Sequence, residues 1–224
     1  MKITYLSHSG FVVEMQHTIL IFDYFEGDLS QFDCNKKMIF FVSHHHDDHF
    51  NLKIFHCLNC HYVLSDDVSV LPDQNFIQVC ANQSILFEGL QIHTLRSTDL
   101  GVAFVVEVEN QRIYHAGDLN DWQWPPENKQ DELDNEKMQK DYLCELKKVA
   151  GMHFNLAFVP LDPRLESNAC KGIKQWLEMT DTDVLFPMHM WQDYSVIQQA
   201  LKTELSAWKN RIQIITKCNQ VFEI

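Results

Sequence analysis

Four histidines and two aspartates stand directly behind an apolar run in FFVSHHHDDHF, residues 40–50. Within this segment, His44, His46, Asp48 and His49 spell H-x-H-x-D-H. A neutral imidazole and an ionised carboxylate each present a lone pair to a divalent cation. Residues two apart on a loop can curl around a common point when a preceding strand fixes the root of the loop. The spacing therefore predicts a metal site, and the alternative is a solvated, histidine-rich turn.

A buried strand is the expected mount for this loop. KKMIFFVS is a nearly continuous apolar run, which predicts a strand buried on both faces with the histidines at its carboxyl end. Shorter β-rich runs precede it and a second group of strands follows. The other predicted strands are KITYL, FVVEM, TILIFDYF, SILFEGLQIHTL, GVAFVVEVE, QRIYHAG, NLAFVP, DVLFPMH, RIQIIT and VFEI.

Helical spacing appears after the second group of strands. A polar insert at about 121–150 begins with WQWPPENKQ and then spaces Met138, Tyr142, Leu146 and Val149 three to four residues apart, which predicts an amphipathic helix. A second helix is predicted over residues 169–179, with Ser167 or Asn168 as its cap. A third is predicted from an apolar face formed by Ile197, Ala200, Leu201, Leu205 and Trp208.

The order of these elements predicts a single α/β domain over residues 1–224. Two strand-rich groups, each followed by helices, suggest two sheets packed together and covered on both outer faces. A chain of 224 residues is long enough to bury a core of this size.

Composition narrows the class of partner. The formal net charge is -13 and no basic run appears, which argues against nucleic acid as a partner. No apolar run approaches the roughly 20 residues that span a bilayer, and the first residues alternate like a strand rather than a signal peptide. We therefore expect a cytoplasmic protein without a membrane partner, and the seven scattered cysteines fit free thiols.

One cysteine pair matches a known cofactor-binding pattern. Cys57, Cys60 and His61 form a C-x-x-C-H pattern that is typical of covalent haem attachment. Haem attachment of this type normally requires an export signal, and zinc binding would require a second ligand pair at a recognisable spacing. Free thiols are the default interpretation.

Two further candidate ligands follow later strands. Asp118 stands in HAGDL and His189 in LFPMHMW. Taken alone, Asp118 fits a turn and His189 a hydrogen-bonded core histidine. Gly117 allows a sharp exit from the strand that would bring the Asp118 carboxylate over the end of the sheet.

The H-x-H-x-D-H motif after an apolar strand resembles the metallo-β-lactamase superfamily. LSHSGF and ILIFDYF at the start of the chain are similar to the branch that contains ascorbate-6-phosphate lactonase. The likeness covers most of the chain except residues 122–150. It implies a four-layer αββα sandwich of two mixed sheets with helices on both outer faces, and a metal-dependent hydrolase.

The resemblance also implies a set of ligands for two divalent ions, zinc first, with manganese, iron or nickel as alternatives. One ion would be held by His44 and His46. The other would be held by Asp48, His49 and His189, with Asp118 as the bridge between the two ions.

The chain departs from the family pattern at one ligand. Many relatives carry a further histidine before the strand that corresponds to GVAFVVEVE, and this chain has Arg96-Ser97-Thr98-Asp99-Leu100 there. Asp99, a hydroxyl of Ser97 or Thr98, or water could take its place. A weaker first metal site is one consequence.

The implied chemistry is hydrolysis by metal-activated hydroxide. The expected substrate is a small, anionic molecule with an ester, lactone or phosphodiester bond. With two ions, the hydroxide would bridge them; with one, Asp48 would serve as a general base.

Several side chains are candidates for the pocket. Arg164, His8 and His115 are predicted to contact the substrate, and Arg164 could grip an anion at two points. The alternatives are an ion pair of Arg164 with Asp162 or Glu166, and structural roles for the two histidines. Three tryptophans could roof the site or belong to the core: Trp122, Trp124 and Trp191.

Two other functions remain open on the same scaffold. Histidine and carboxylate ligands also suit iron, which predicts a redox protein as the first alternative. The departure at residues 96–100 leaves a non-catalytic metal-binding or sensor protein as the second. The sequence does not decide between a monomer and an oligomer.

Overall fold

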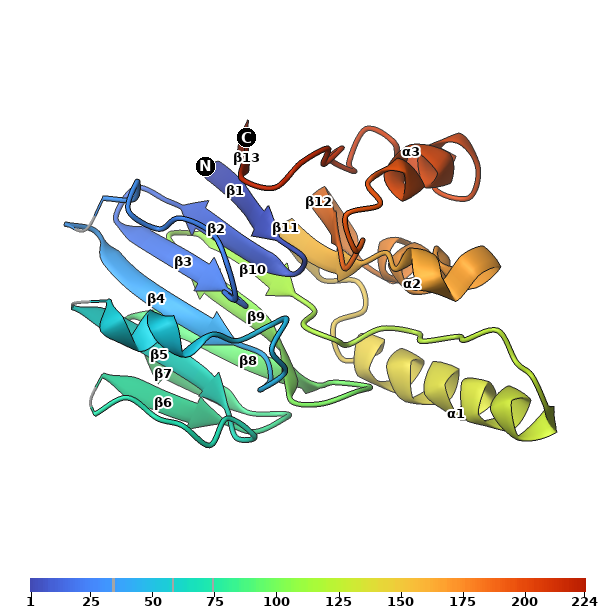
Figure 1. The fold of residues 1–224 in the computed structure, drawn as a ribbon, viewed down its shortest axis with the longest axis horizontal. Coiled ribbons are helices and arrows are strands. Elements are labelled where there is room, and N and C mark those ends of the chain that lie inside the picture. The colour runs from blue at the N-terminus through green and yellow to red at the C-terminus, as the bar shows by residue number, and fades with distance from the viewer. Residues whose placement is uncertain (34, 58, 74) are drawn as a thin grey trace.

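Two β-sheets pack face to face in the computed structural model, which describes residues 1–33, 35–57, 59–73 and 75–224 (Figure 1). The first sheet has seven strands in the order β13-β1-β2-β3-β4-β5-β6. Neighbouring strands from β13 to β3 are antiparallel, whereas β3, β4, β5 and β6 run parallel. The strands are β1 (Lys2–Ser7), β2 (Gly10–Glu14), β3 (Thr18–Phe22), β4 (Lys37–Val42), β5 (Cys60–Ser65), β6 (Phe76–Val79) and β13 (Gln220–Glu223).

The second sheet has six strands in the order β12-β11-β10-β9-β8-β7. The β10, β11 and β12 strands are parallel, and β7 to β10 form an antiparallel meander. The strands are β7 (Ser84–Phe87), β8 (Leu90–Arg96), β9 (Val102–Val108), β10 (Gln111–His115), β11 (His153–Pro160) and β12 (Asp181–Met188).

Aromatic side chains fill the space between the sheets. Phe41 of β4 meets Phe104 of β9 edge to face with ring centroids 5.2 Å apart, and Phe22 of β3 meets Phe158 of β11 at 5.9 Å. All four rings are fully buried. Each such side chain stabilises the fold by about 1.5–3 kcal/mol relative to exposure, which explains why the inner face of β4 is apolar. Phe40 on the outer face of β4 belongs to a second buried cluster that includes Ile54.

The α-helices cover the outer side of the second sheet and its strand ends (Figure 1). The side chain of Asn128 caps α1 (Lys129–Leu146) by accepting from the backbone N–H groups of Gln130 and Asp131. Trp176 of α2 (Lys171–Met179) stacks on Tyr114 of β10, with ring centroids 3.9 Å apart. The third α-helix is α3 (Ser195–Lys202).

A 3₁₀ helix and loops cover the outer face of the first sheet. Ile54 of η1 (Leu52–His56) is buried there, and the Tyr62 hydroxyl of β5 donates to its carbonyl oxygen at 3.0 Å. Phe55 packs against Tyr62 with ring centroids 5.2 Å apart.

The α/β class with two mixed sheets is confirmed, and the polar insert forms the amphipathic helix α1 with Tyr142 and Leu146 buried. The strands β5 and β6 were not predicted from the sequence. The predicted strand RIQIIT is wrong apart from one bridge between Ile212 and Leu185. Ile212 and Ile215, three residues apart, are both buried while Ile214 is exposed, which is not the alternation of a strand.

The predicted ends of two helices also need correction. Ser167 and Asn168 do not cap α2, because they lie in the 3₁₀ helix η2 (Pro163–Asn168), and Cys170 occupies the N-cap position. The helix predicted from Ile197 to Trp208 breaks after Lys202, and a short 3₁₀ turn, η3 (Ser206–Trp208), follows.

Two glycines lock the end of β4 against the second sheet. Gly117 has a φ of +50°, which confirms the sharp turn predicted before Asp118. A Cβ at Gly117 would lie 2.6 Å from the Ser43 Cβ, and one at Gly101, where φ is +68°, would lie 1.9 Å from the Ser43 carbonyl oxygen. The backbone contact at Ser43 therefore requires the absence of a side chain at both positions.

Among the described residues, no helix has the length and apolar character that crossing a bilayer requires.

Replacing Gly101 by alanine tests this packing. We expect Gly101→Ala to lower the free energy of unfolding by about 3 kcal/mol or more, because it adds a clash with backbone to the cost of a left-handed residue. Gly151→Ala is the matched control, since φ there is +73° and nothing lies within 4 Å of the place that its Cβ would take. Urea denaturation of both variants should show a loss of only about 1–2 kcal/mol for the control; equal losses would contradict the account.

Candidate metal centre

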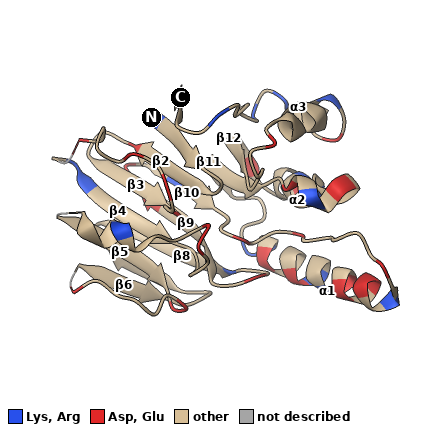
Figure 2. Cartoon of the chain, viewed as in Figure 1, with Lys and Arg blue, Asp and Glu red and all other residues tan. Residues whose placement is uncertain are grey.

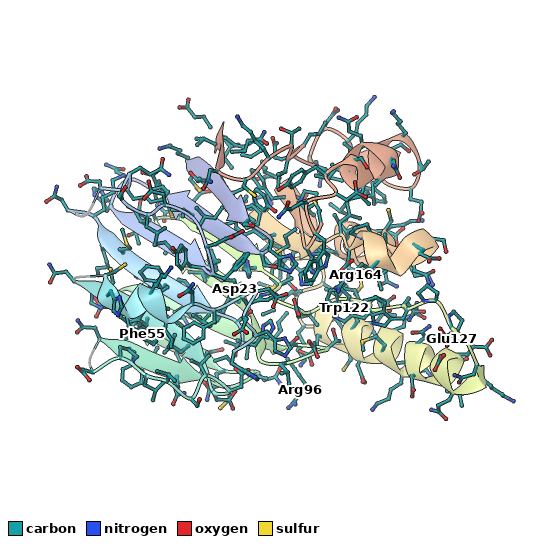
Figure 3. All side chains as sticks on the ribbon, viewed as in Figure 1. Asp23, Phe55, Arg96, Trp122, Glu127 and Arg164 are labelled. Atoms are coloured by element: carbon teal, nitrogen blue, oxygen red, sulfur yellow. The ribbon has the colours of Figure 1, made fainter. Side chains whose placement is uncertain are left out.

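The candidate ligands all follow the carboxyl ends of strands. His8 follows β1, the histidine loop follows β4, Asp118 follows β10 and His189 follows β12. These strands run in one direction within each sheet, so their ends meet along one edge of the sandwich. Figure 3 shows Asp23, Trp122 and Arg164 near this edge, between the strands and the helices.

The predicted ligands form two adjacent clusters. His44, His46, Asp99 and Asp118 make the first cluster, and one ligand atom from each lies within 4.8 Å of the others. His8, Asp48, His49 and His189 satisfy the same condition and make the second cluster. The structure thus brings together every residue that the sequence analysis assigned to the two metal ions.

Asp118 lies between the two clusters. Its Oδ2 is 3.6 Å from Nε2 of His44 in the first cluster. Its Oδ1 is 3.2 Å from Nε2 of His49 and 3.1 Å from Nε2 of His189 in the second. One carboxylate oxygen therefore faces each cluster, which is the arrangement expected of a bridging ligand.

Asp99 joins the first cluster from the segment at which the sequence departs from the family pattern. Its Oδ2 lies 3.9 Å from Nδ1 of His46, and both side chains are partly open to solvent. The Ser97 hydroxyl is instead used locally, as it accepts from the Asp99 backbone N–H at 3.1 Å. The Thr98 hydroxyl donates to the carbonyl oxygen of Asn120. Of the alternatives weighed for this position, the geometry favours Asp99.

His8 lies closer to the centre than predicted. Its Nε2 is 3.3 Å from Oδ2 of Asp48, and its ring centroid is 3.9 Å from that of His189. The residue has a φ of +49°, and its carbonyl oxygen accepts from the His189 backbone N–H. His8 can thus serve as a ligand of the second cluster rather than as a substrate contact.

Asp23 orients two of the imidazoles and was missed in the sequence analysis. Fully buried, it accepts from Nδ1 of His49 at 2.8 Å and from the backbone N–H and hydroxyl of Ser43 at 2.7 Å. The Ser43 oxygen in turn lies 2.9 Å from Nδ1 of His44. With both Nδ1 atoms engaged as donors, the Nε2 lone pairs of His44 and His49 face the centre.

Asp162 orients the imidazole of His189. Its Oδ2 accepts from Nδ1 of His189 at 3.0 Å and from the Trp191 indole N–H at 3.1 Å. Arg164 also donates to both carboxylate oxygens through Nε. The sequence signal for both missed aspartates was their place directly after the apolar runs TILIF and FVPL.

Two predicted substrate contacts need revision. His115 is fully buried, stacks on Phe22 with ring planes 6° apart, and lies 2.9 Å from the Ser9 carbonyl oxygen through Nε2. It is a structural histidine, because a ring enclosed in this way cannot reach a substrate. Arg164 forms the ion pair with Asp162 that was weighed as the alternative, at 2.6 Å, and its outer edge stays exposed.

The side chains between the motif ligands lie outside both clusters. His45 is half-exposed and pairs with Asp67 at 2.8 Å through Nδ1, and Asp47 is exposed.

Burial and neighbouring charges set the protonation of the clusters. Burial lowers the pKa of both His44 and His8 to about 4, which keeps them neutral. Burial also opposes a charge on His49, but Asp118 and Asp23 outweigh it and raise its pKa well above the usual value. Burial likewise opposes ionisation of Asp118, yet His49 and His189 hold its pKa well below its usual range.

Unsatisfied polar atoms show that the clusters fit cations. Nε2 of His8 and Oδ1 of Asp118 are buried without a hydrogen-bond partner of good geometry among the described residues. Because Nδ1 of His49 and of His189 are committed to carboxylates, their Nε2 lone pairs face the oxygen lone pairs of Asp118 at 3.1–3.2 Å. Such a contact requires a cation or added protons between the atoms. Divalent ions with imidazole and carboxylate ligands supply it.

A cavity of 220 Å³ opens on both clusters. It is lined by Thr98, Asp99, Asp118, Trp122, Trp124, Met138, Arg164 and His189. Larger surface cavities in the described part of the chain, of 570 and 510 Å³, contain none of the clustered residues.

Comparison with known proteins defines the family. The family model described as "Beta-lactamase superfamily domain" matches residues 2–133, which is more than half of the chain. The chain therefore belongs to this family, and its fold is that of the metallo-β-lactamases. The comparison with curated proteins finds no match.

Solved structures share the fold at low sequence identity. Igni18, described as a metallo hydrolase of the archaeon Ignicoccus hospitalis, is 16% identical with a TM-score of 0.66, over 100% of this chain and 98% of that chain. A protein of Parabacteroides distasonis, described as a metal-dependent hydrolase, is 15% identical with a TM-score of 0.70, over 96% and 92%. CmlA of Streptomyces venezuelae, described as a diiron β-hydroxylase, is 11% identical with a TM-score of 0.64, over 100% and 54%.

Removing the Asp23 charge tests its orienting role. Asp23→Asn should weaken metal binding by about 10–100-fold, because the amide no longer holds Nδ1 of His49 as a donor. Asp67→Asn is the matched control, since Asp67 holds His45 outside the clusters. Competition with a chromophoric chelator measures both variants; equal affinity of the two variants would contradict the orienting role.

Metal binding should release protons. The raised pKa of His49 means that this imidazole carries a proton at pH 7 before a metal binds, and a ligand must be neutral. We expect about one to two protons released per protein, and an apparent affinity that rises as pH increases toward the raised pKa. Calorimetric titration in two buffers of different ionisation enthalpy measures the release. A binding heat that does not depend on the buffer would be the contrary result.

Proposed function

We propose that the protein is a metal-dependent hydrolase of a small, anionic substrate with an ester, lactone or phosphodiester bond. The position of Asp118, with one carboxylate oxygen toward each cluster, is the observation that carries this proposal. Two ions bound by these clusters would acidify a water molecule and would offset the negative charge that develops on the attacked group. The similarity to the branch that contains ascorbate-6-phosphate lactonase stays a prediction and supports the lactone as one substrate class.

The ligand sets follow from the two clusters. His44, His46 and Asp99 would hold one ion, and His8, Asp48, His49 and His189 would hold the other, with Asp118 shared. The second cluster is richer in imidazole and more buried, so it should bind the first equivalent of metal. Five imidazoles across the pair favour zinc.

Asp48 is better suited to metal ligation than to proton transfer. Burial would raise the pKa of its carboxyl, but the contact with the His8 ring and the charge of His49 lower it below its usual range. A weakly basic carboxylate stays ionised for a cation and is a poor general base at neutral pH. The low pKa of Asp48 therefore argues against the general-base role predicted for it in a single-metal centre.

The hydrolytic function is tested by replacing the shared ligand. Metal-loaded protein should cleave at least one class in a panel of aryl and alkyl esters, lactones and phosphodiesters. Asp118→Ala should reduce that rate at least about a hundredfold, because the ions lose their common ligand. Asp47→Ala is the matched control, because Asp47 is an exposed aspartate of the histidine loop that belongs to neither cluster. A protein that retains two metal ions and cleaves no member of the panel would contradict the proposal.

An iron-dependent oxidation on the same fold is the second candidate. Asp99 in place of a histidine gives the first cluster two carboxylates, which suit iron as well as zinc. CmlA, with the same fold, is described as a diiron β-hydroxylase. Iron found by elemental analysis, with visible absorbance after aerobic purification, would favour this candidate; zinc and a colourless protein would favour the hydrolase.

A further inference from the structure

The polar insert at residues 121–150 builds one wall of the 220 Å³ cavity. Trp122, Trp124 and Met138 all come from residues 121–150 and line the cavity together with Asp118 and His189. Ligand pockets commonly measure about 300–1,000 Å³. The smaller volume limits the group that can reach the two clusters to one ring or a short chain.

The aromatic wall is fixed in place. The indole N–H of Trp122 donates to the Asp118 carbonyl oxygen at 2.9 Å, and its ring lies 5.2 Å from that of His189. Trp124 runs nearly parallel to Trp122, with ring planes 11° apart. The Trp124 side chain is 43% exposed, so one part of this wall is available to a bound molecule.

A preoriented cation stands beside this wall. The Arg164 guanidinium lies between two indoles, 5.3 Å from the Trp124 ring and 4.3 Å from the Trp191 ring. Its Nε and Nη2 donate to Asp162. Its Nη1 has no partner in the part of the chain that the structure describes, and the side chain is 45% exposed.

Carboxylates and one guanidinium line the cavity. Asp162 already balances the charge of Arg164, and Asp99 and Asp118 are carboxylates on the cavity wall. Acidic residues also cover α1 beside the cavity, and the chain carries a net charge of -13 (Figure 2). The free guanidinium edge of Arg164 can donate to one carboxylate of a bound molecule.

From this cavity, we infer that the substrate is a small aromatic ester or lactone with a single carboxylate. The ring packs against Trp124 and Met138, the carboxylate accepts from Nη1 of Arg164, and the ester carbonyl faces Asp118 between the clusters. In the reaction, the oxygen of water forms a bond to the carbonyl carbon and the bond from that carbon to the leaving oxygen breaks. One proton of water passes to the leaving oxygen, and the other leaves with the carboxylic acid product.

This inference rests on the proposed hydrolase function, and a binding experiment separates the two. Benzoate is the probe, because it combines one ring with one carboxylate, and acetate is its counterpart without the ring. Affinities of metal-loaded protein for both are measured by ligand-observed NMR titration, which requires no turnover. Benzoate should bind about tenfold more tightly than acetate, because only benzoate has a ring that can pack against Trp124.

Variants locate the binding. Met138→Ala should weaken benzoate binding about three- to tenfold and leave acetate binding unchanged. Trp124→Ala should weaken benzoate binding more than acetate binding, because the Trp124 ring also contacts Arg164. Leu133→Ala on the exposed side of α1 is the matched control and should change neither. Arg164→Gln should weaken the binding of both benzoate and acetate about tenfold. The metal content of this variant is measured to show that the contact between Asp162 and His189 survives.

The outcomes are distinct for the two proposals. Equal affinity for benzoate and acetate, or benzoate binding that survives Trp124→Ala unchanged, would overturn the inference about the substrate. Benzoate binding as described, in a protein that hydrolyses no ester or lactone, supports the inference about the cavity while it overturns the proposed function. Preferential cleavage of aromatic over matched alkyl esters supports both.

Discussion

The close packing of imidazoles and carboxylates at one edge of the sandwich is the constraint on which the rest of the structure depends. Lone pairs of His49 and His189 face an oxygen of Asp118 at 3.1–3.2 Å, and this contact is almost fully shielded from water. Such an arrangement is costly unless positive charge lies between the atoms. Protons can supply that charge at low pH, and divalent cations supply it while leaving the imidazoles neutral.

The scaffold imposes this packing through close backbone contacts and one buried carboxylate, Asp23. Gly101 and Gly117 let the second sheet approach Ser43, and Ser43 links Asp23 to His44. Asp23 and His189 hold left-handed backbone conformations, with φ of 43° and 70°, that a residue other than glycine adopts at a cost of order 1–3 kcal/mol. Tertiary packing therefore positions the ligands before any metal or substrate binds.

The sequence predicted the parts of this centre that are local. The spacing of His44 to His49 behind an apolar strand, and the acids and histidine after later strands, predicted residues that the structure gathers into the two clusters. The two-sheet class followed from the strand groups. The sequence did not predict the long-range partners. Asp23 and Asp162 look like ordinary turn residues until the fold places them against imidazoles. The burial of His115 and the position of His8 likewise depend on contacts between distant strands, and RIQIIT has the composition of a strand without an edge to pair with beyond one bridge.

A crystal structure of the zinc-loaded protein, with anomalous scattering recorded at the zinc edge, tests the central claim most directly. The account predicts two anomalous peaks, one among His44, His46 and Asp99 and the other among His8, Asp48, His49 and His189, with Asp118 bound to both. A single peak away from Asp118, or zinc held only by Cys57 and Cys60, would contradict the claim.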